Sequence, residues 1–589
     1  MHTLSRQKFF PIDPPGARLL SELWHYQRQD RYISADTIRV LARKHRVSEI
    51  EIQGVASFYH FFHLKPAGKH TIYLNTSVIS EFRGYERVRT AFEQATGARM
   101  GSTDISGTFG LFPTACIGLS DQEPAALIDF YPFTNLNVVR VKEIIQQIRE
   151  GIHPAEICDH PADHIRFTPP DGKSVFFTPY LRGNGIRRAL KIGRQAIIEE
   201  IKIAGLSGRG GAFFPTWKKW DACRSFTSDP KVIICNADEG EPGTFKDRVL
   251  LNKQAGSVIE GMIIAAFAVG ATYGMIYLRG EYQWLLNHLE DELVAFREAG
   301  LLGKNIAGTD GFDFDIRIEL GAGAYVCGEE TALLESMEGR RGEPRTKWFY
   351  PVERGYLQLP TVVNNVETFA AACRILEMGS GEYCKRGIPS SPGTKIISVA
   401  GDCQKPGIYE IEYGTSVGEL LDMSMAIDPL FIQVSGPSGE TLTTTDRDRI
   451  FIPRSINPER EIRCGGSLMV FSKERDILQI IMNFNAFFKH ESCGVCTPCR
   501  AGNFIIQRKL EKLRSGLADH HDLHELKSWT HIMRKSSRCG LGKTAGNPVL
   551  TALEKFGEYF EGTYGAYHND LIHPFDYTRA IAPFEQYKP

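Results

Sequence analysis

The stretch Gly205-Leu-Ser-Gly-Arg-Gly-Gly-Ala-Phe-Phe-Pro-Thr-Trp-Lys-Lys-Trp220 decides how the rest of the chain is interpreted. It surrounds Arg209 with three glycines and places two lysines downstream. Clustered glycines let a backbone turn tightly and bring its amides to an anion, and a following helix adds the amides of its N-terminus. The stretch therefore indicates a phosphate-holding loop. Because Phe213 stands where the fingerprint G-x-G-x-x-G has its third glycine, an ordinary glycine turn remains an alternative.

Three apolar segments downstream of this loop predict buried strands, at 231–235, 275–278 and 314–319. The first leads into an acidic loop, and the third into a glycine-rich loop that opens a helix. Strand, loop and helix in this order predict an open α/β sheet, in which ligands bind beyond the carboxyl ends of the strands. We expect this domain to span residues 175–388.

Carboxylates gather in these two loops, with Asp238, Glu239 and Glu241 in one and Glu329 and Glu330 in the other. Adjacent carboxylates are often only a solvated surface, but here they follow buried strands and are flanked by glycines. Carboxylates bind ribose hydroxyls and repel a 2′-phosphate, which favours NAD(H) over NADP(H).

A cysteine cluster lies towards the C-terminus. Cys493, Cys496 and Cys499 have C-x2-C-x2-C spacing, which suits three corners of a cubane. Cys539 is the only cysteine further downstream and is the candidate fourth ligand. The spacing predicts a [4Fe–4S] cluster, because zinc sites usually come as two C-x2-C pairs. Free structural thiols are the third alternative.

These sites together imply a flavin. An iron–sulfur cluster passes one electron at a time, whereas a nicotinamide exchanges a hydride, which carries two. A flavin is the usual cofactor that converts between the two. The sequence therefore predicts a flavin between the nucleotide and the cluster.

Composition agrees with a multidomain globular protein. The chain has 589 residues, 42% of them hydrophobic and 24% charged, with a net charge of −1. Its length suggests about four domains. The near-neutral charge gives no support to a nucleic-acid binder. The most apolar run, 262–269, is too short to span a membrane, and the N-terminus lacks a signal-peptide core, so we expect a cytoplasmic protein without a membrane span.

The remaining segments have their own patterns. Helical spacing dominates residues 1–65, and strands at 71–75 and 125–129 with a helix at 85–96 predict a small α/β domain at 66–160. Prolines and a glycine at 161–172 indicate a linker. Short strands and turns at 394–470 predict a β-rich insert, and residues 475–589 are mainly helical.

With these motifs assembled, the chain resembles the NADH-oxidising flavoprotein subunit of respiratory complex I and its relatives. The resemblance covers about 175–589. It rests on Gly208-Arg-Gly-Gly211, Cys235-Asn-Ala-Asp-Glu-Gly-Glu-Pro-Gly-Thr-Phe-Lys-Asp-Arg248, Gly321-Ala-Gly-Ala-Tyr-Val-Cys-Gly-Glu-Glu330, Val363-Asn-Asn-Val-Glu-Thr368 and Glu491 to Arg500. It implies a Rossmann-like domain that binds FMN and stacks NADH on it, a ubiquitin-like β-grasp insert, and a C-terminal helical bundle that holds the [4Fe–4S] cluster.

The resemblance also implies site residues, position by position. The FMN site would comprise Gly208, Arg209, Gly210, Gly211, Lys219, Asn236, Asp238, Glu239, Tyr325, Gly328, Glu329, Asn364, Asn365 and Thr368. NADH would meet Phe214, Glu241, Glu330, Lys347 and Tyr350. Two positions depart from the family, since Ala222 replaces an aromatic residue and Tyr350 a phenylalanine. Phe214 is also compatible with a place in the core. No side chain is expected to act as a general acid or base.

The first 150 residues resemble the thioredoxin-like partner subunit of the same enzymes, fused here in front. That partner holds a [2Fe–2S] cluster with four cysteines, whereas the matching positions here are Asn75, Ser80, Cys116 and Ser120. We therefore expect no [2Fe–2S] cluster in this domain, which would serve as a structural dock.

The fused arrangement, with Ser57-Phe-Tyr-His-Phe-Phe62 and Cys116-Ile-Gly-Leu-Ser-Asp-Gln-Glu-Pro124, resembles the diaphorase subunit of soluble NAD-reducing [NiFe] hydrogenases. The partners implied are a small iron–sulfur diaphorase subunit and the [NiFe] hydrogenase subunits. The equivalent subunit of an NAD-dependent formate dehydrogenase or of complex I is the alternative. A scaffold protein that has lost its chemistry is a second class, disfavoured because the flavin loops and the four cluster cysteines are intact.

Overall fold

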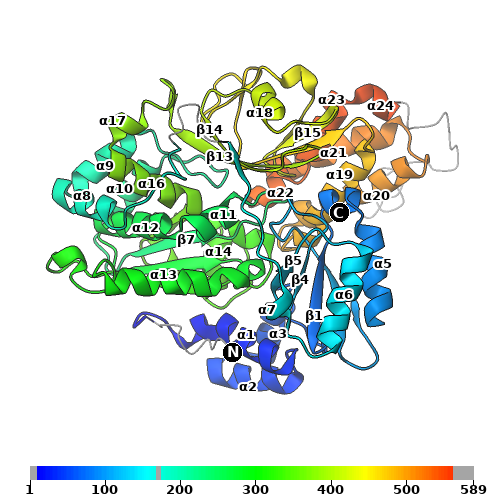
Figure 1. Ribbon diagram of the computed structural model, residues 1–589, viewed down its shortest axis with the longest axis horizontal. Helices are drawn as coiled ribbons and strands as arrows, with labels where there is room; N and C mark the ends of the chain where they lie inside the picture. The colour runs from blue at the N-terminus through cyan, green and yellow to red at the C-terminus, as the bar shows by residue number, and fades with distance from the viewer. Residues whose placement is uncertain (1–9, 168–173, 562–589) are drawn as a thin grey trace, which may run out of the picture.

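The computed structural model describes residues 10–167 and 174–561. The expectations for the first nine residues, for the linker residues Pro169, Pro170 and Gly172, and for residues 562–589 lie outside the described residues. Figure 1 shows the N-terminal elements at the bottom, the central elements at the left, and the C-terminal helices at the upper right.

The N-terminal part begins with helices and continues into a mixed sheet. The helices are η2 (Pro15–Arg18), α1 (Leu19–Asp30), α2 (Ala35–His45) and α3 (Glu49–Ala56). The hydroxyls of Ser34 and Ser48 cap α2 and α3, which satisfies backbone amides that a helix start leaves unpaired.

The mixed sheet has the order β2-β3-β1-β4-β5. Its strands are β1 (His70–Asn75), β2 (Ser102–Thr103), β3 (Phe109–Thr114), β4 (Ala126–Ile128) and β5 (Tyr131–Phe133), and its helices are α4 (Val78–Phe82), α5 (Tyr85–Thr96), α6 (Val138–Arg149) and α7 (Pro154–Ile157). Strand β1 is parallel to β3 and antiparallel to β4.

The central part is built on an all-parallel sheet of order β10-β7-β8-β9. The strands are β7 (Val232–Ala237), β8 (Tyr273–Leu278), β9 (Asp315–Leu320) and β10 (Thr361–Asn365). The helices are α8 (Asn184–Ile192), α9 (Arg194–Ile203), α10 (Thr216–Ser225), α11 (Lys246–Lys253), α12 (Ala255–Val269), α13 (Leu286–Glu298), α14 (Glu330–Met337), α15 (Pro351–Arg354), α16 (Val366–Met378) and α17 (Ser380–Tyr383). Short 3-10 turns join them: η3 (Gly280–Leu285), η4 (Ile306–Gly308), η5 (Tyr325–Gly328) and η6 (Tyr356–Gln358).

Helix α12 is almost wholly buried, because its sequence is apolar on every face and neighbouring helices cover it. It packs against α16 at Gly261, where a Cβ would lie 2.0 Å from the carbonyl oxygen of Phe369. A larger residue would separate the two helices.

A second, six-stranded sheet follows, with the order β16-β15-β19-β13-β14-β6. Its strands are β13 (Thr394–Gly401), β14 (Gly407–Glu412), β15 (Pro429–Val434), β16 (Glu440–Leu442) and β19 (Ser467–Ser472), with α18 (Val417–Met423) after β14. The sixth strand, β6 (Ile165–Phe167), comes from the linker and pairs parallel with β14. The small pairs β11 (Gly387–Ile388) with β12 (Ser391–Pro392) and β17 (Ile450–Phe451) with β18 (Glu461–Ile462), and the turn η7 (Thr444–Asp446), complete this part.

The described chain ends in six helices: α19 (Ile477–Glu491), α20 (Thr497–Arg514), α21 (His520–Ser536), α22 (Gly540–Thr544), α23 (Asn547–Lys555) and α24 (Gly557–Glu561). Within the described ranges, none of the helices is long and apolar enough to cross a membrane. All thirteen cysteines are free.

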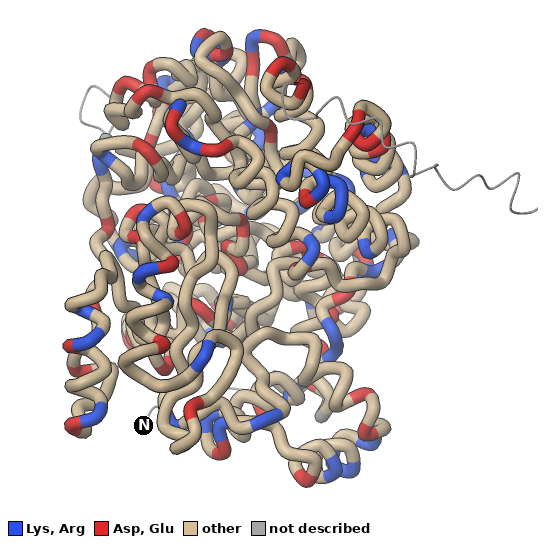
Figure 2. Tube along the Cα trace, turned by 90° about the vertical axis from the view of Figure 1, so that its right-hand side faces the viewer, with Lys and Arg blue, Asp and Glu red and all other residues tan. Residues whose placement is uncertain are grey.

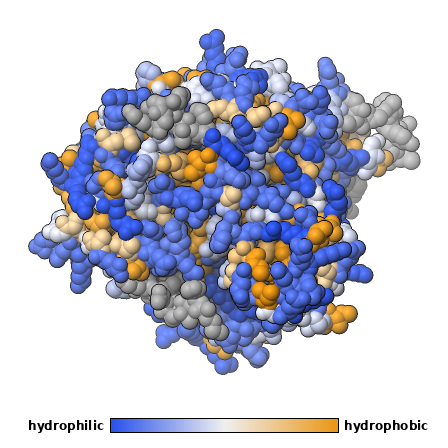
Figure 3. All heavy atoms as spheres, in the orientation of Figure 1, coloured by the Kyte–Doolittle hydropathy of each residue, from blue (hydrophilic) through white to orange (hydrophobic). Residues whose placement is uncertain are grey.

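Figure 2 shows basic and acidic residues interspersed along the trace, and Figure 3 shows hydrophobic side chains in small groups on one face.

The strands expected at 231–235, 275–278 and 314–319 correspond to β7, β8 and β9. One local expectation was incomplete. The glycine-rich loop does not open α14 directly, because the 3-10 turn η5 comes first and the carboxylate of Glu329 then caps α14.

Candidate functional site

The predicted phosphate-holding loop, residues 205–216, is closed at its base. Gly208 donates its amide to the carbonyl of Phe214 at 2.9 Å, and Thr216 donates to Leu206 at 3.0 Å just before α10 begins. Gly211 has φ +99°, a conformation that favours glycine. The amides of Gly210 and Gly211 donate to no protein acceptor within residues 10–167 and 174–561. Exposed amides at the tip of a closed loop fit a phosphate group.

Arg209 has its side chain in the core. Its guanidinium donates to the hydroxyls of Tyr383, at 3.0 Å, and Tyr413, and it lies 4.9 Å from the centre of the Tyr413 ring. Its backbone amide donates to the Thr368 hydroxyl at 3.0 Å. The structure therefore brings Thr368 to the loop 205–216. The guanidinium of Arg209 fixes this loop to the core through Tyr383 and Tyr413.

The acidic loop after β7 places its first two carboxylates differently. Glu239 is buried and accepts from the amides of Asp247 at 2.8 Å and Arg248 at 3.1 Å, and from the hydroxyl of Tyr282 at 2.9 Å. Burial raises its pKa to about 7. These contacts attach the acidic loop to the start of α11, so the Glu239 carboxylate is engaged within the protein.

Asp238 has a carboxylate oxygen that accepts no hydrogen bond from the described residues. This oxygen, Oδ2, is buried. Burial raises the pKa of Asp238 well above its usual range. Gly328 lies against it, since a Cβ there would be 3.3 Å from the Asp238 carbonyl oxygen, and Asn236 donates to the Gly328 carbonyl at 2.8 Å. A buried polar atom without a partner beside a glycine fits a bound polar ligand.

The acidic loop after β7 and the glycine-rich loop before α14 are joined by side chains. Tyr325 donates its hydroxyl to Glu241 at 2.5 Å, and the amide of Ser438 donates to the other Glu241 oxygen at 2.8 Å. Burial raises the pKa of Glu241 to about 7. Lys219 reaches over from α10 and bonds Glu330 at 3.0 Å and the Val363 carbonyl at 2.9 Å.

The end of β10 completes this group. Asn364 accepts from the indole of Trp220 at 2.9 Å, and a Cβ at Gly210 would lie 3.3 Å from the Cβ of Asn365. Asn365 also caps α16 through the amide of Glu367 and donates to Asp247 at 2.6 Å. The structure thus joins the predicted FMN residues of four separate segments.

Beneath these residues lies a buried ion network that the sequence analysis did not assign. Lys246 contacts Asp247 at 2.6 Å and Glu367 at 3.0 Å, and Lys395 of β13 contacts Glu367 as well. Burial opposes ionisation of Glu367, but the two lysines outweigh it and lower its pKa to about 2. The network joins three segments that lie far apart in the sequence, around Lys246, Glu367 and Lys395, and the sequence gives no signal that they pair.

Of the residues predicted to meet NADH, three lie at the surface. Phe214 is 50% exposed and Tyr350 is 64% exposed, and Lys347 is exposed too. This excludes a core position for Phe214, whereas its neighbour Phe213 is 8% exposed. No described contact joins these three side chains to one another.

Three of the four predicted cluster ligands lie at a helix start or inside a first turn, and the fourth, Cys493, lies in the loop between α19 and α20. Cys496 is the N-cap of α20 and Cys539 the N-cap of α22, while Cys499 lies within α20. A Cβ at Gly542 would lie 3.0 Å from the Cβ of Cys499, so the two segments are in contact. Helix N-termini favour negative charge, as thiolate ligands require.

The thiols also influence each other's ionisation. Burial raises the pKa of Cys499 to about 12, and the neighbouring thiols Cys496, Cys539 and Cys493 oppose its ionisation further. Yet within the described part of the chain no three metal-ligating side chains are close enough to hold one ion. Four thiolates around a single zinc would lie about 3.8 Å apart at a Zn–S distance of about 2.3 Å. In a cubane each of the four thiolates binds its own iron, so the ligands of one cluster do not have to surround a single ion.

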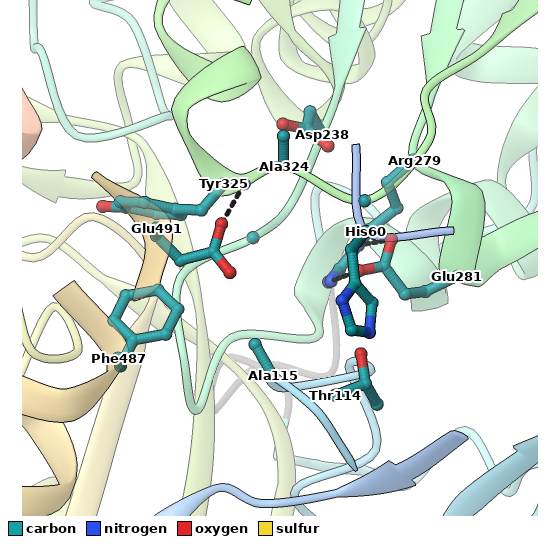
Figure 4. A pocket seen from close by; sticks show the side chains of 12 residues that line it. His60, Thr114, Ala115, Asp238, Arg279, Glu281, Ala324, Tyr325, Phe487 and Glu491 are labelled. Atoms are coloured by element: carbon teal, nitrogen blue, oxygen red, sulfur yellow. Dashed lines mark hydrogen bonds and ion pairs between the residues drawn. The ribbon is translucent and has the colours of Figure 1, made fainter. Parts of the chain in front are cut away.

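A small cavity of about 20 Å³ lies between the two predicted ligand loops, the N-terminal domain and α19, and both polar and apolar groups line it (Figure 4). It is lined by His60, Thr114, Ala115, Asp238, Gly240, Arg279, Glu281, Gly323, Ala324, Tyr325, Phe487 and Glu491. Figure 4 shows the carboxylate of Glu491 turned to the backbone of Tyr325, and its hydrogen bond there is 2.8 Å. Sequence reasoning assigned no role to His60, Arg279 or Glu281, because their positions depend on contacts between distant segments.

Comparisons with known proteins agree with this layout. Residues 201–374 match the family model of the Nuo51 FMN-binding domain, and residues 479–563 match that of the NADH-ubiquinone oxidoreductase-F iron-sulfur binding region. Residues 12–149 match the thioredoxin-like [2Fe-2S] ferredoxin model.

Whole-chain relatives include the NAD-reducing hydrogenase HoxS subunit alpha of Cupriavidus necator, 46% identical over 97% of this chain and 96% of that protein. An NADH-quinone oxidoreductase subunit of Aquifex aeolicus is 40% identical over 65% of this chain and 90% of its own length. A crystal structure of an NAD+-reducing [NiFe]-hydrogenase in the air-oxidized state aligns with a TM-score of 0.86 at 36% identity, covering 98% of this chain and 97% of that one.

The fold and the site define an NAD-dependent oxidoreductase subunit with flavin and iron–sulfur domains. The interpretation of the motifs as flavin and [4Fe–4S] sites is confirmed at the level of these domains. The chain belongs to the family of NAD-reducing hydrogenase alpha subunits, which is related to the flavin-domain subunits of NADH-quinone oxidoreductases.

One expectation is wrong. We expected no [2Fe–2S] cluster in the N-terminal domain, but residues 12–149 match a family of [2Fe-2S] ferredoxins. The expectation compared only four side chains, whereas the match rests on the whole domain. In the structure the Cys116 thiol lies 3.4 Å from the Ser120 hydroxyl, and Asn75 donates to Glu123. The function proposed for this chain does not depend on a cluster in this domain.

Proposed function

We propose that this chain is the diaphorase subunit of an NAD-reducing hydrogenase. A hydride passes between NAD(H) and FMN in the central part of the chain. Single electrons then pass between the flavin and partner iron–sulfur and hydrogenase subunits by way of a [4Fe–4S] cluster on Cys493, Cys496, Cys499 and Cys539. The reaction is reversible, and the FMN and the cluster supply all of its redox chemistry when bound.

One observation carries this proposal. The amide of Tyr325 in the glycine-rich loop is bonded to Glu491, which lies two residues before Cys493. The predicted flavin loop and the predicted cluster loop are therefore one connected unit, which suits electron transfer over a short distance.

The protein's own residues bind and orient in this proposal. The exposed amides of Gly210 and Gly211 hold phosphate, and the free oxygen of Asp238 accepts from a polar group of the flavin or the nicotinamide. Lys219 and Glu330 form an ion pair at the edge of the site. The carboxylate of Glu241 disfavours a 2′-phosphate, and the exposed rings of Phe214 and Tyr350 offer flat surfaces to the nucleotide.

The hydrogenase assignment is preferred to a complex I subunit for a specific reason. The match to the hydrogenase alpha subunit extends over 97% of this chain and includes the N-terminal domain, whereas the match to the Aquifex aeolicus oxidoreductase covers 65%. The proposal also takes residues 394–470 as a ubiquitin-like β-grasp domain. Its support is the parallel pairing of β13 with β19 and the helix α18 that follows the β13–β14 hairpin.

The domain boundaries and the location belong to the proposal too. The proposed domains are an N-terminal helical region (1–65), a thioredoxin-like domain (66–160), an FMN- and NADH-binding domain (175–388), a β-grasp domain (394–470) and a helical cluster-binding domain (475–589). A cytoplasmic location is supported by the thirteen free cysteines, since reducing compartments keep thiols unpaired.

The test is an anaerobic titration of the purified chain with NADH and then NADPH, following flavin and iron–sulfur absorbance together. Bleaching of both chromophores by NADH, and not by NADPH, is the expected result. If a preparation verified to contain FMN and iron does not respond to NADH, the proposal fails and a scaffold role replaces it.

A further inference from the structure

Two buried arginines join the N-terminal domain to the flavin side of the molecule. Arg279, at the end of β8, donates to the Cys116 carbonyl at 2.7 Å and, through another nitrogen, to the carbonyl of Glu239. Arg248, in α11, donates to the Gly118 carbonyl at 3.0 Å. Both side chains are almost fully buried. The loop that carries Cys116 is therefore fastened to the acidic loop by direct hydrogen bonds.

The counter-charges of these arginines lie on both sides of the junction. Arg279 bonds Glu281 at 2.8 Å and 3.0 Å, and Arg248 bonds Asp121 of the N-terminal domain at 3.3 Å. Buried charges persist only when they are paired and hydrogen-bonded. Separating the N-terminal domain from the flavin side would break the Arg248–Asp121 pair and leave these charges with only their contacts to the linker residues Asp163 and His164, which disfavours separation.

Tyr282 is the second residue that connects the N-terminal domain with the acidic loop. Its hydroxyl donates to the carboxylate of Glu239 at 2.9 Å, and this carboxylate also accepts from the amides of Asp247 and Arg248. Three donors leave Glu239 little freedom. Glu239 is bonded through the main chain to Asp238, the residue with the unpartnered buried oxygen.

Gly118 of the N-terminal domain stands directly behind Tyr282. Gly118 has φ +73°, and a Cβ at this position would lie 2.1 Å from the Tyr282 hydroxyl and 2.8 Å from the ring carbon that carries it. Any side chain here would push Tyr282 away from Glu239. The N-terminal domain thus supports the ring that holds the acidic loop.

We propose that Tyr282 and Arg279 are positioning residues for the flavin site, and that the N-terminal domain sets their position through the loop 116–121. The contacts run from Gly118 and Cys116, through Tyr282 and Arg279, to Glu239 and so to Asp238. The N-terminal domain is in this way part of the flavin site, although none of its residues belongs to the predicted FMN set. The inference rests on the proposed function, because it takes Asp238 to face the flavin.

The test compares three variants of the full-length chain by their dissociation constants for FMN. Tyr282→Phe keeps the ring and removes the bond to Glu239, and Gly118→Ala displaces the ring. Gly151→Ala is the matched control, because Gly151 lies in the same domain with φ +95° and nothing is within 4 Å of its Cβ position. The thermal midpoint of each variant is measured alongside.

Tyr282→Phe is expected to weaken FMN binding about tenfold, which corresponds to about 1.4 kcal/mol, because Glu239 and the neighbouring Asp238 are then held less firmly in the binding geometry. Gly118→Ala is expected to weaken it at least as much, and Gly151→Ala to leave it unchanged. At saturating FMN the kcat of Tyr282→Phe should recover, which a general loss of folded protein would not allow.

Two results would overturn the inference, and they are distinguishable. If the wild-type chain binds FMN and both Tyr282→Phe and Gly118→Ala bind it as tightly as Gly151→Ala, the positioning role fails and the proposed function stands. If the wild-type chain does not bind FMN at all, the proposed function fails and the inference fails with it.

Discussion

The hydroxyl of Tyr325 lies 2.5 Å from a carboxylate oxygen of Glu241, so the glycine-rich loop before α14 is bonded to the acidic loop after β7. This bond is made to the charged form of Glu241 and therefore favours its ionisation. Burial works in the opposite direction and dominates, which leaves the pKa of Glu241 at about 7. The charge of the acidic loop consequently changes within the physiological pH range.

The first prediction concerns the choice between NADH and NADPH. As pH rises through about 7, Glu241 becomes ionised and repels a 2′-phosphate, so the preference for NADH should increase on the order of tenfold. The preference is measured as the ratio of steady-state kcat/KM for NADH and NADPH. The range of about pH 6 to 8.5 covers the pKa of Glu241. Tyr325→Phe should move the transition to higher pH, because it removes the bond that favours ionisation.

Glu241→Gln should abolish that transition, and the exposed Glu459→Gln serves as its control. A transition that survives in Glu241→Gln would assign it to a different group.

The second prediction concerns Glu367, which holds two buried lysines. Glu367→Gln should cost about 3–5 kcal/mol, because Lys246 and Lys395 lose their shared counter-charge. The folded-state pKa of Glu367 is lowered to about 2, so its stabilisation is complete above the unfolded pKa of about 4.5. That stabilisation is lost as pH falls through about 2.

Thermal midpoints of Glu367→Gln and of Glu199→Gln, measured at pH 7, provide the comparison. Glu199 pairs with Lys202 at 3.1 Å on the surface, where such a pair contributes less than about 1 kcal/mol. Equal midpoints for the two variants would contradict the role of the buried network.

The third prediction concerns the cluster. Cys539→Ala should remove the iron–sulfur absorbance and the transfer of electrons to a partner, while NADH still reduces the flavin and a dye acceptor. Iron content and absorbance measure the first effect and dye reduction the second. Cys384→Ala is the control, since this half-buried thiol contacts only the Ile203 carbonyl among its described hydrogen bonds. Full iron content in Cys539→Ala would exclude Cys539 as a ligand.

The fourth prediction separates two adjacent lysines of α10. Lys219→Met removes the bonds to Glu330 and to the Val363 carbonyl, and should weaken nucleotide or flavin binding roughly tenfold. Lys218→Met should have little effect, because Lys218 is exposed and only lies near the Trp217 ring. Titration of both variants with FMN and NADH decides this, and similar constants for the two would remove Lys219 from the site.

The features that sequence reasoning predicted are those encoded in short segments. The cysteine spacing, the glycine cluster and the apolar strands β7, β8 and β9 each depend on neighbours a few residues away. Glu239 shows the limit of such reasoning. Its pattern indicates a ligand-facing carboxylate, but the amides of α11 and the hydroxyl of Tyr282 occupy it.

Arg209 shows the same limit, because its charge is satisfied by two tyrosines more than 170 residues away in the chain. Glu491 and His60 lie within motifs that carry a resemblance, but neither they nor Arg279 were assigned an individual role. Their roles arise where three parts of the fold meet, which no spacing within one segment reveals. The N-terminal domain makes a similar point at a larger scale, since four side chains did not represent the family of the whole domain.

Strand β6 has a consequence for dissecting this protein. It belongs to the linker, yet it forms the outer strand of the six-stranded sheet beside β14. A fragment that starts after residue 167 would leave the backbone of β14 unpaired at that edge. Unpaired edges recruit strands from other molecules, so such a fragment is prone to self-association. Cutting the chain between its N-terminal and central parts would therefore expose the edge of β14 that β6 covers in the intact chain, and fragments meant to remain monomeric need to retain Ile165–Phe167.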